Sequence, residues 1–268
     1  MKIAIQESSL PGETILQKMK TAQKIGIEGI EVSSDGLHTR NEEVLGAMEA
    51  TGVRIAAVNA GATHLLHPEF SHREKALVTL RTAMTDALDI GADGVVFIPH
   101  YSTSAVLPDL RPYKSAIEME GELLVAQLRA TLTDLAYALG SQLYMLAVSK
   151  QRAHLINTLY QAYVIRDKID HHPHLTLAAE LCDMQSEEDD PVGALVDYGA
   201  HLGYVHIADT SHRLPGHGDM NFNTILSALK MNAYDGWLTL TCNVPNIDDP
   251  TYVDDLSASV AMLNAAMS

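Results

Sequence analysis

Short apolar runs alternate with longer amphipathic segments along the whole chain of 268 residues. The short runs predict strands at 2–6, 29–32, 54–58, 94–99, 143–148, 175–179, 204–208 and 237–241. The longer segments predict helices at 14–25, 41–51, 72–90, 117–139, 153–169, 191–201, 223–231 and 250–266. Most of the strands are continuous apolar runs, which is typical of parallel strands covered by helices. Eight strand–helix units therefore predict a single α/β domain over residues 1–268, folded as a (β/α)₈ barrel.

Glycines support these boundaries. Five of them stand where a predicted helix should end, which is the position that favours a left-handed backbone: Gly26, Gly52, Gly91, Gly140 and Gly203. The alternative is a doubly wound open sheet. However, no Gly-x-Gly-x-x-Gly turn follows the first strand, so the pattern favours the barrel.

The composition of the chain argues against several classes of function. The formal net charge is −16, and no cluster of Lys and Arg stands out, which argues against a nucleic-acid partner. No run approaches the roughly 18 apolar residues of a membrane span. The start of the chain lacks the pattern of a signal peptide, and two cysteines give no disulfide framework, so we expect a cytoplasmic protein without a membrane partner.

In a barrel of this kind, functional residues lie just beyond the carboxyl ends of the strands. His206 lies in the seventh predicted strand, which leads into a polar loop with the sequence HIADTSHRLPGHG up to Gly218. A histidine at such a position suits metal or sugar-hydroxyl binding. His100 also follows a strand directly, and the long segment 102–114 behind it is a candidate lid.

The 206–218 segment resembles the seventh strand and loop of the sugar-phosphate isomerase/epimerase-like barrels, the xylose-isomerase-like superfamily, where the pattern is H-x-A-D-x-x-R-x-x-P-G-x-G. Three further tracts are similar to that family: AHLINTL from residue 153, EED from 187 and YDGW from 234. Sugar 3-epimerases are the nearest in pattern. The resemblance implies a TIM barrel with one divalent ion held by Glu, Asp, His and Glu after strands five to eight. The two glutamates then exchange a proton with a carbon of the bound sugar.

Alignment on these tracts indicates that the metal site has diverged. The glutamate of strand five falls on Leu146, or alternatively on Ala147, and that of strand eight falls on Thr241. Leucine cannot bind a metal, and a neutral hydroxyl is a poor ligand. The aspartate of strand six becomes Glu180, while His206 is retained. We therefore expect no tightly bound cofactor, and at most a weak Mn²⁺ or Mg²⁺ site at His206 and Glu180.

Other charged residues near the predicted strand ends could take over the chemistry. We assign candidate catalytic roles to Glu180, Asp183 and Lys150, with the Lys150 ammonium facing the two acids in place of a metal. His100, His212 and Arg213 are candidate substrate-binding residues, and Arg213 stands one position after the family's arginine. Glu7 and Glu31, at the ends of the first and second strands, could each be a compensating acid, but the sequence gives neither of them a partner.

Two functions stay open at this point. The first is a sugar isomerase or epimerase with a diverged metal site, acting on a small-molecule carbohydrate. The second is a non-catalytic relative that binds a carbohydrate or partners an active paralogue; whether the chain is an enzyme is therefore undecided. A metal-free lyase or hydrolase that uses Glu180, Asp183 and Lys150 is a third possibility, and formation of a homo-oligomer is also open.

Overall fold

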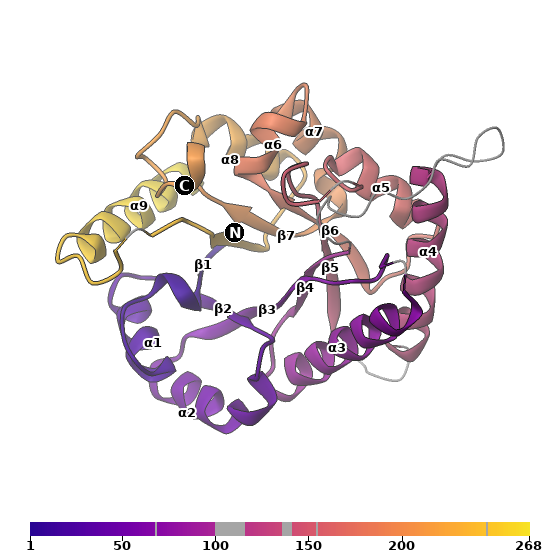
Figure 1. The fold of residues 1–268 in the computed structure, drawn as a ribbon. Coiled ribbons are helices and arrows are strands. Elements are labelled where there is room, and N and C mark those ends of the chain that lie inside the picture. Colours follow the sequence, from indigo (N-terminus) through magenta and orange to yellow (C-terminus); the bar gives the residue numbers. More distant parts are fainter. Residues whose placement is uncertain (68, 100–115, 136–140, 154, 245) are drawn as a thin grey trace.

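The computed structural model describes residues 1–67, 69–99, 116–135, 141–153, 155–244 and 246–268. Eight parallel strands follow one another in chain order and close into one barrel, in which β1 pairs with both β2 and β8 (Figure 1). The strands are β1 (Lys2–Gln6), β2 (Gly29–Ser33), β3 (Arg54–Ala62), β4 (Gly94–Ile98), β5 (Gln142–Leu146), β6 (Leu175–Glu180), β7 (Leu202–Ile207) and β8 (Trp237–Leu240). The predicted (β/α)₈ barrel is confirmed.

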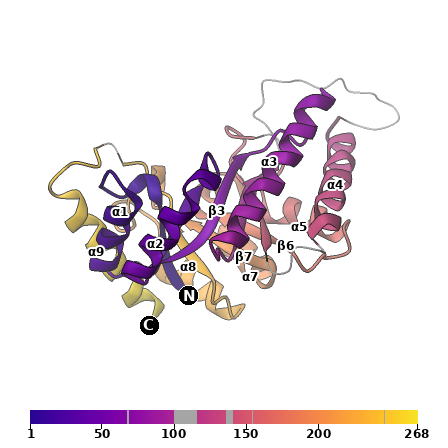
Figure 2. The same ribbon diagram turned by 90° about the horizontal axis from the view of Figure 1, so that it is seen from below.

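Helices surround the barrel, and α3 and α4 rise together at one side of it (Figure 2). They are α1 (Ile15–Lys24), α2 (Asn41–Thr51), α3 (Phe70–Asp89), α4 (Ala116–Leu135), α5 (Leu159–Asp167), α6 (Leu181–Glu187), α7 (Pro191–Tyr198), α8 (Phe222–Met231) and α9 (Tyr252–Met267). Short 3₁₀ turns, Glu7–Ser9, Leu37–Thr39, Gly199–His201 and Thr210–His212, lie between the longer elements. Within the described residues, no helix has the length and apolar character needed to cross a bilayer.

Two helix predictions differ from the structure. The helix expected at 153–169 begins only at Leu159, because Thr158 caps it. The Thr158 hydroxyl accepts a hydrogen bond from the Gln161 backbone amide, and the Gln161 side-chain oxygen accepts one from the Thr158 backbone amide. The sequence prediction also missed α6, which follows β6 without a loop, so Glu180 is both the last residue of the strand and the N-cap of the helix. Glu180 therefore lies at the rim of the barrel.

Tyrosine rings pack inside the barrel below its mouth, and glycines on neighbouring strands leave space for them. We call these rings, Tyr144 and Tyr204, the tyrosine layer. Tyr144 and Tyr204 stack with ring centroids 5.1 Å apart, and the Thr239 hydroxyl donates to the Tyr204 hydroxyl at 2.6 Å. A Cβ at Gly203 would collide with the Tyr144 ring and with Thr176. Gly203 lies inside β7, so its prediction as a helix end was wrong; the prediction holds at Gly26, Gly52 and Gly91, which have positive φ, and Gly140 lies outside the described residues.

Gly94 gives a test of this packing. A Cβ at Gly94 would lie 2.6 Å from the Gln142 carbonyl oxygen and 2.7 Å from the Tyr144 ring, so we expect Gly94→Ala to lower the free energy of unfolding by about 1–3 kcal/mol. The control is Gly46→Ala in α2, where nothing lies within 4 Å and alanine should stabilise the helix by about 0.5–1 kcal/mol. Urea unfolding measures both, and equal effects would contradict the packing argument.

Candidate active site at the barrel mouth

Side chains from opposite sides of the barrel meet above the tyrosine layer. On β7, His206 follows Tyr204 by two positions, so both rings are directed to the barrel interior, and their centroids lie 5.6 Å apart. Glu180 ends β6 beside His206 in the strand register, and Glu31 reaches the same point from β2. All three residues are buried, with 2% of each exposed.

His206 lies between two carboxylates. Its Nε2 is 2.7 Å from Glu31 Oε2, and its Nδ1 is 3.2 Å from Glu180 Oε2. The second oxygen of Glu31 accepts hydrogen bonds from the side-chain amides of Gln6 at 2.9 Å and Asn59 at 2.7 Å. Of the two acids that the sequence left without a partner, Glu31 pairs with His206, whereas Glu7 pairs with Lys18 and Arg40.

A second group of charges surrounds Asp183 on α6. Its Oδ2 accepts hydrogen bonds from the Ser149 amide at 2.9 Å and from Arg152 Nη1 at 3.2 Å. Its Oδ1 is 3.3 Å from His212 Nε2. The same Arg152 nitrogen lies 3.9 Å from Glu180 Oε2, so this guanidinium connects the two groups.

The electrostatics follow from these contacts. Burial alone would lower the pKa of His206, but the neighbouring Glu31 and Glu180 outweigh it and raise the pKa to about 10. The hydrogen bond to Asp183 raises the pKa of His212, also to about 10. Burial opposes ionisation of Glu31 and Asp183, yet their histidine partners lower the pKa of both acids. Near neutral pH both histidines are therefore cations and both acids are anions.

The six side chains form one alternating chain of acids and cations. In order, they are Glu31, His206, Glu180, Arg152, Asp183 and His212. We call this set the ion chain. Because each buried acid has a cation next to it, the cost of burying the charges is offset within the set. The ion chain therefore supplies positive charge at the mouth from side chains alone.

A pocket of about 320 Å³ lies at the mouth and is in contact with the ion chain. Its lining is polar and consists of Gln6, Asn59, Arg152, Glu180, His206, His212, Thr241 and Asn243. The Thr241 hydroxyl lies 3.4 Å from each oxygen of Glu180. We call this the central pocket; its size and hydrogen-bonding groups suit a small polar ligand.

Four of the seven predicted site residues come together here: Glu180, Asp183, His206 and His212. Lys150 does not face Glu180 and Asp183 as expected; its side chain is 73% exposed, and its Nζ lies 3.3 Å from Glu187. Arg213 is exposed and does not line the central pocket; its guanidinium donates to Thr210 at 3.2 and 3.3 Å. His100 and the candidate lid 102–114 lie outside the described residues.

The sequence predicted that Lys150 would be the cation beside Glu180 and Asp183, but the structure places Arg152 there. Between Ser149 and Ala153 the chain makes a turn, because the Ser149 carbonyl accepts from the amides of both Arg152 and Ala153. This turn carries Arg152 back over Asp183 and leaves Lys150 outside. The signal for Glu31 was stronger, since it is a single charged residue in an otherwise apolar strand. No sequence signal singled out Gln6, Asn59 or Asn243.

The residues at the mouth do not fit the divalent ion that the family resemblance implies. Leu146 ends β5 without a donor atom, and the side chain after β8 is the hydroxyl of Thr241. Both ring nitrogens of His206 already face carboxylates, and the Arg152 guanidinium lies 3.9 Å from Glu180. Among the described residues, no three His, Cys, Asp or Glu side chains are arranged to hold a metal ion. A metal would have to displace a cation from the ion chain.

We accordingly expect the purified protein to retain far less than one divalent ion per chain. The reason is that two of the family's four ligand positions lack a charged donor, and losing even a supporting partner costs 10–100-fold in affinity. Elemental analysis for Mn, Mg and Zn after dialysis against a chelator measures this, with the undialysed sample as the control. One firmly held ion per chain after dialysis would contradict the prediction.

Residues 19–264 match the model of the xylose isomerase-like TIM barrel family, which covers most of the chain. The chain belongs to this family. Its similarity to the 3-dehydro-D-guloside 4-epimerase of Escherichia coli (strain K12) is 26% identity over 263 residues, or 96% of this chain and 98% of the relative. Ketose 3-epimerase of Arthrobacter globiformis is 29% identical over 39% of this chain and 36% of the relative.

Solved structures agree with this placement. The crystal structure of the 3-keto-D-glucoside 4-epimerase from E. coli, in its apo form, has a TM-score of 0.86 and 25% identity, with 99% of each chain covered. The D-psicose 3-epimerase of Clostridium cellulolyticum H10, crystallised with D-tagatose, has a TM-score of 0.87 at 17% identity over the full length of both chains, which supports the fold alone. The expected relationship to sugar epimerases is confirmed.

Proposed function

We propose that this protein is a sugar epimerase for a glycoside that carries a ketone on the sugar ring, and that it works without a tightly bound metal in the cytoplasm. The relative that is similar over nearly its full length is named for a 3-dehydro sugar glycoside. A ring ketone makes the proton on the adjacent carbon acidic. Removal of that proton gives an enolate directly, so the reaction needs a base, a cation near the oxygen and a group that returns the proton.

The ion chain offers these three parts in one pocket. Glu180 at the floor is the proposed base, and its carboxylate lies 3.9 Å from the Arg152 guanidinium. A guanidinium is a cation with several N–H donors, so Arg152 is the proposed partner of the enolate oxygen. His212 also lines the central pocket and is about one quarter exposed in its side chain, so we assign the returning proton to it.

One observation carries this proposal: a buried carboxylate and a fixed cation lie side by side in a polar pocket of about 320 Å³. A second candidate, a carbohydrate-binding protein without catalysis, is favoured by a different observation. Both oxygens of Glu180 contact Thr241, and one also contacts His206, so the proposed base is restrained by its neighbours.

Deuterium exchange separates the two candidates. The protein is incubated in D₂O with methyl 3-dehydro-α-D-glucoside and EDTA. Proton NMR then follows the signals of the protons bound to the carbons next to the ketone. We expect loss of one signal and appearance of the epimer, at the same rate with EDTA as with Mn²⁺. Free ketoses should show no exchange even with Mn²⁺. Binding of the glycoside without exchange would favour the second candidate, and exchange that requires Mn²⁺ would contradict the metal-free mechanism.

A further inference from the structure

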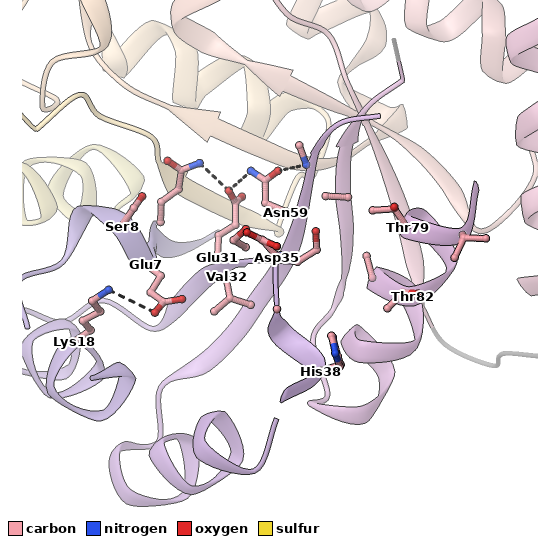
Figure 3. Close-up of a pocket in the computed structure, with 18 residues that line it drawn as sticks. Glu7, Ser8, Lys18, Glu31, Val32, Asp35, His38, Asn59, Thr79 and Thr82 are labelled. Carbon is pink, nitrogen blue, oxygen red and sulfur yellow. Dashed lines mark hydrogen bonds and ion pairs between the residues drawn. The ribbon is translucent and has the colours of Figure 1, made fainter. Parts of the chain in front are cut away.

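A second and larger pocket, of about 670 Å³, adjoins the central pocket (Figure 3). It lies between the ends of β1, β2 and β3 on one side and α3 on the other. Gln6 and Asn59 line both pockets, and their side-chain amides meet at Glu31 Oε1. Glu31 also lines the second pocket, while its other oxygen contacts His206 of the central one. The two pockets therefore share Gln6 and Asn59 in their walls.

Hydroxyl and carboxylate groups line part of this second pocket, next to apolar side chains such as Val32 and Val78. Ser34 and Asp35 reach it from the turn after β2, and Thr79 and Thr82 face it from α3, as Figure 3 shows for the labelled residues. No Phe, Tyr or Trp is among the described residues that line it. A ligand here would be held by hydrogen bonds to its hydroxyl groups, because no aromatic face is available for stacking.

The charges of the pocket point to a neutral ligand. Lys18 lines the second pocket, and its Nζ lies 3.5 Å from Glu7 Oε1. Glu7 in turn accepts from Arg40 at 2.7 Å with both oxygens. The Lys18 ammonium is thus already paired within the wall, and Glu31 and Asp35 add negative charge to the lining, which disfavours a phosphate or a carboxylate.

We propose that the second pocket is a subsite for a second, uncharged sugar ring, so that the preferred substrate is a disaccharide whose oxidised ring occupies the central pocket. This inference rests on the proposed function, because it takes the ring ketone to lie at Glu180. The central pocket alone has space for one ring, and the adjoining pocket has about twice that volume. Two or three added hydrogen bonds to hydroxyls should improve affinity about tenfold.

The test compares three probes by isothermal calorimetry: the 3-dehydro derivatives of trehalose, of methyl α-D-glucoside and of phenyl α-D-glucoside. We expect the disaccharide to bind the unmodified protein about tenfold more tightly than the methyl glycoside, with no such gain for the phenyl glycoside. Thr82→Trp places a large ring in the second pocket, so it should remove the advantage of the disaccharide and leave the methyl glycoside unchanged.

Thr85→Trp is the matched control, because Thr85 is an exposed threonine on the same helix that does not line the pocket. It should alter neither affinity. Equal binding of the methyl glycoside and the disaccharide would overturn the subsite alone, as would an equal gain for the phenyl glycoside or no effect of Thr82→Trp. Binding with the expected pattern but without deuterium exchange would support the subsite and reject the catalytic proposal. Binding of none of the probes would reject both.

Discussion

Replacing Leu146 and Thr241 together with glutamate is expected to give Mn²⁺ binding at least about 100-fold tighter than in the unmodified protein. Leu146 is the last residue of β5, and the Thr241 hydroxyl lies 3.4 Å from both Glu180 oxygens. The two new carboxylates would join Glu180 and His206 and restore the four-ligand set that the family resemblance implies. A titration followed by the electron paramagnetic resonance of free Mn²⁺ measures the affinity.

The single variants Leu146→Glu and Thr241→Glu are the controls. Each should bind Mn²⁺ much more weakly than the double variant, since each supplies only one of the two missing carboxylate ligands. Adding Arg152→Gln to the double variant removes the cation 3.9 Å from Glu180 and should tighten binding further. A double variant that binds no better than the unmodified protein would show that these two positions do not correspond to the family's metal ligands.

Glu180→Gln is expected to slow deuterium exchange of the 3-dehydro glycoside by about 10²–10⁴-fold, the usual contribution of a positioned acid–base group. The amide keeps the size of the side chain but cannot accept the proton. Calorimetry should find the glycoside still bound, because the other lining residues of the central pocket are unchanged. Proton NMR in D₂O measures the rate.

Glu187→Gln is the matched control for this variant. Glu187 ends α6 and pairs with Lys150 outside the central pocket, so its replacement should leave exchange unaltered. Exchange that continues at the original rate in Glu180→Gln would remove Glu180 from the role of base. Loss of both binding and exchange would instead indicate that Glu180 organises the pocket without transferring the proton.

The barrel could be predicted because its signals are local. Each strand is an apolar run of a few residues, each helix is amphipathic, and Gly26, Gly52 and Gly91 have the positive φ that ends a helix. The position of the site at the strand ends follows from the barrel itself, so Glu180, Asp183, His206 and His212 could be placed together in advance. Boundaries failed where one residue ends a strand and begins a helix, as Glu180 does.

The partners within the site depended on the tertiary structure. Glu31 and His206 are 175 positions apart in the chain, and only closure of the barrel brings them to 2.7 Å. The choice of Arg152 over Lys150 depended on a turn that directs one side chain over Asp183 and the other into solvent. The sequence alone determined which strands end at the mouth and that an apolar Leu146 and a neutral Thr241 stand at the ends of the fifth and eighth strands. Which cation meets which acid was decided by side-chain direction across the closed barrel, because spacing along the chain does not encode that direction.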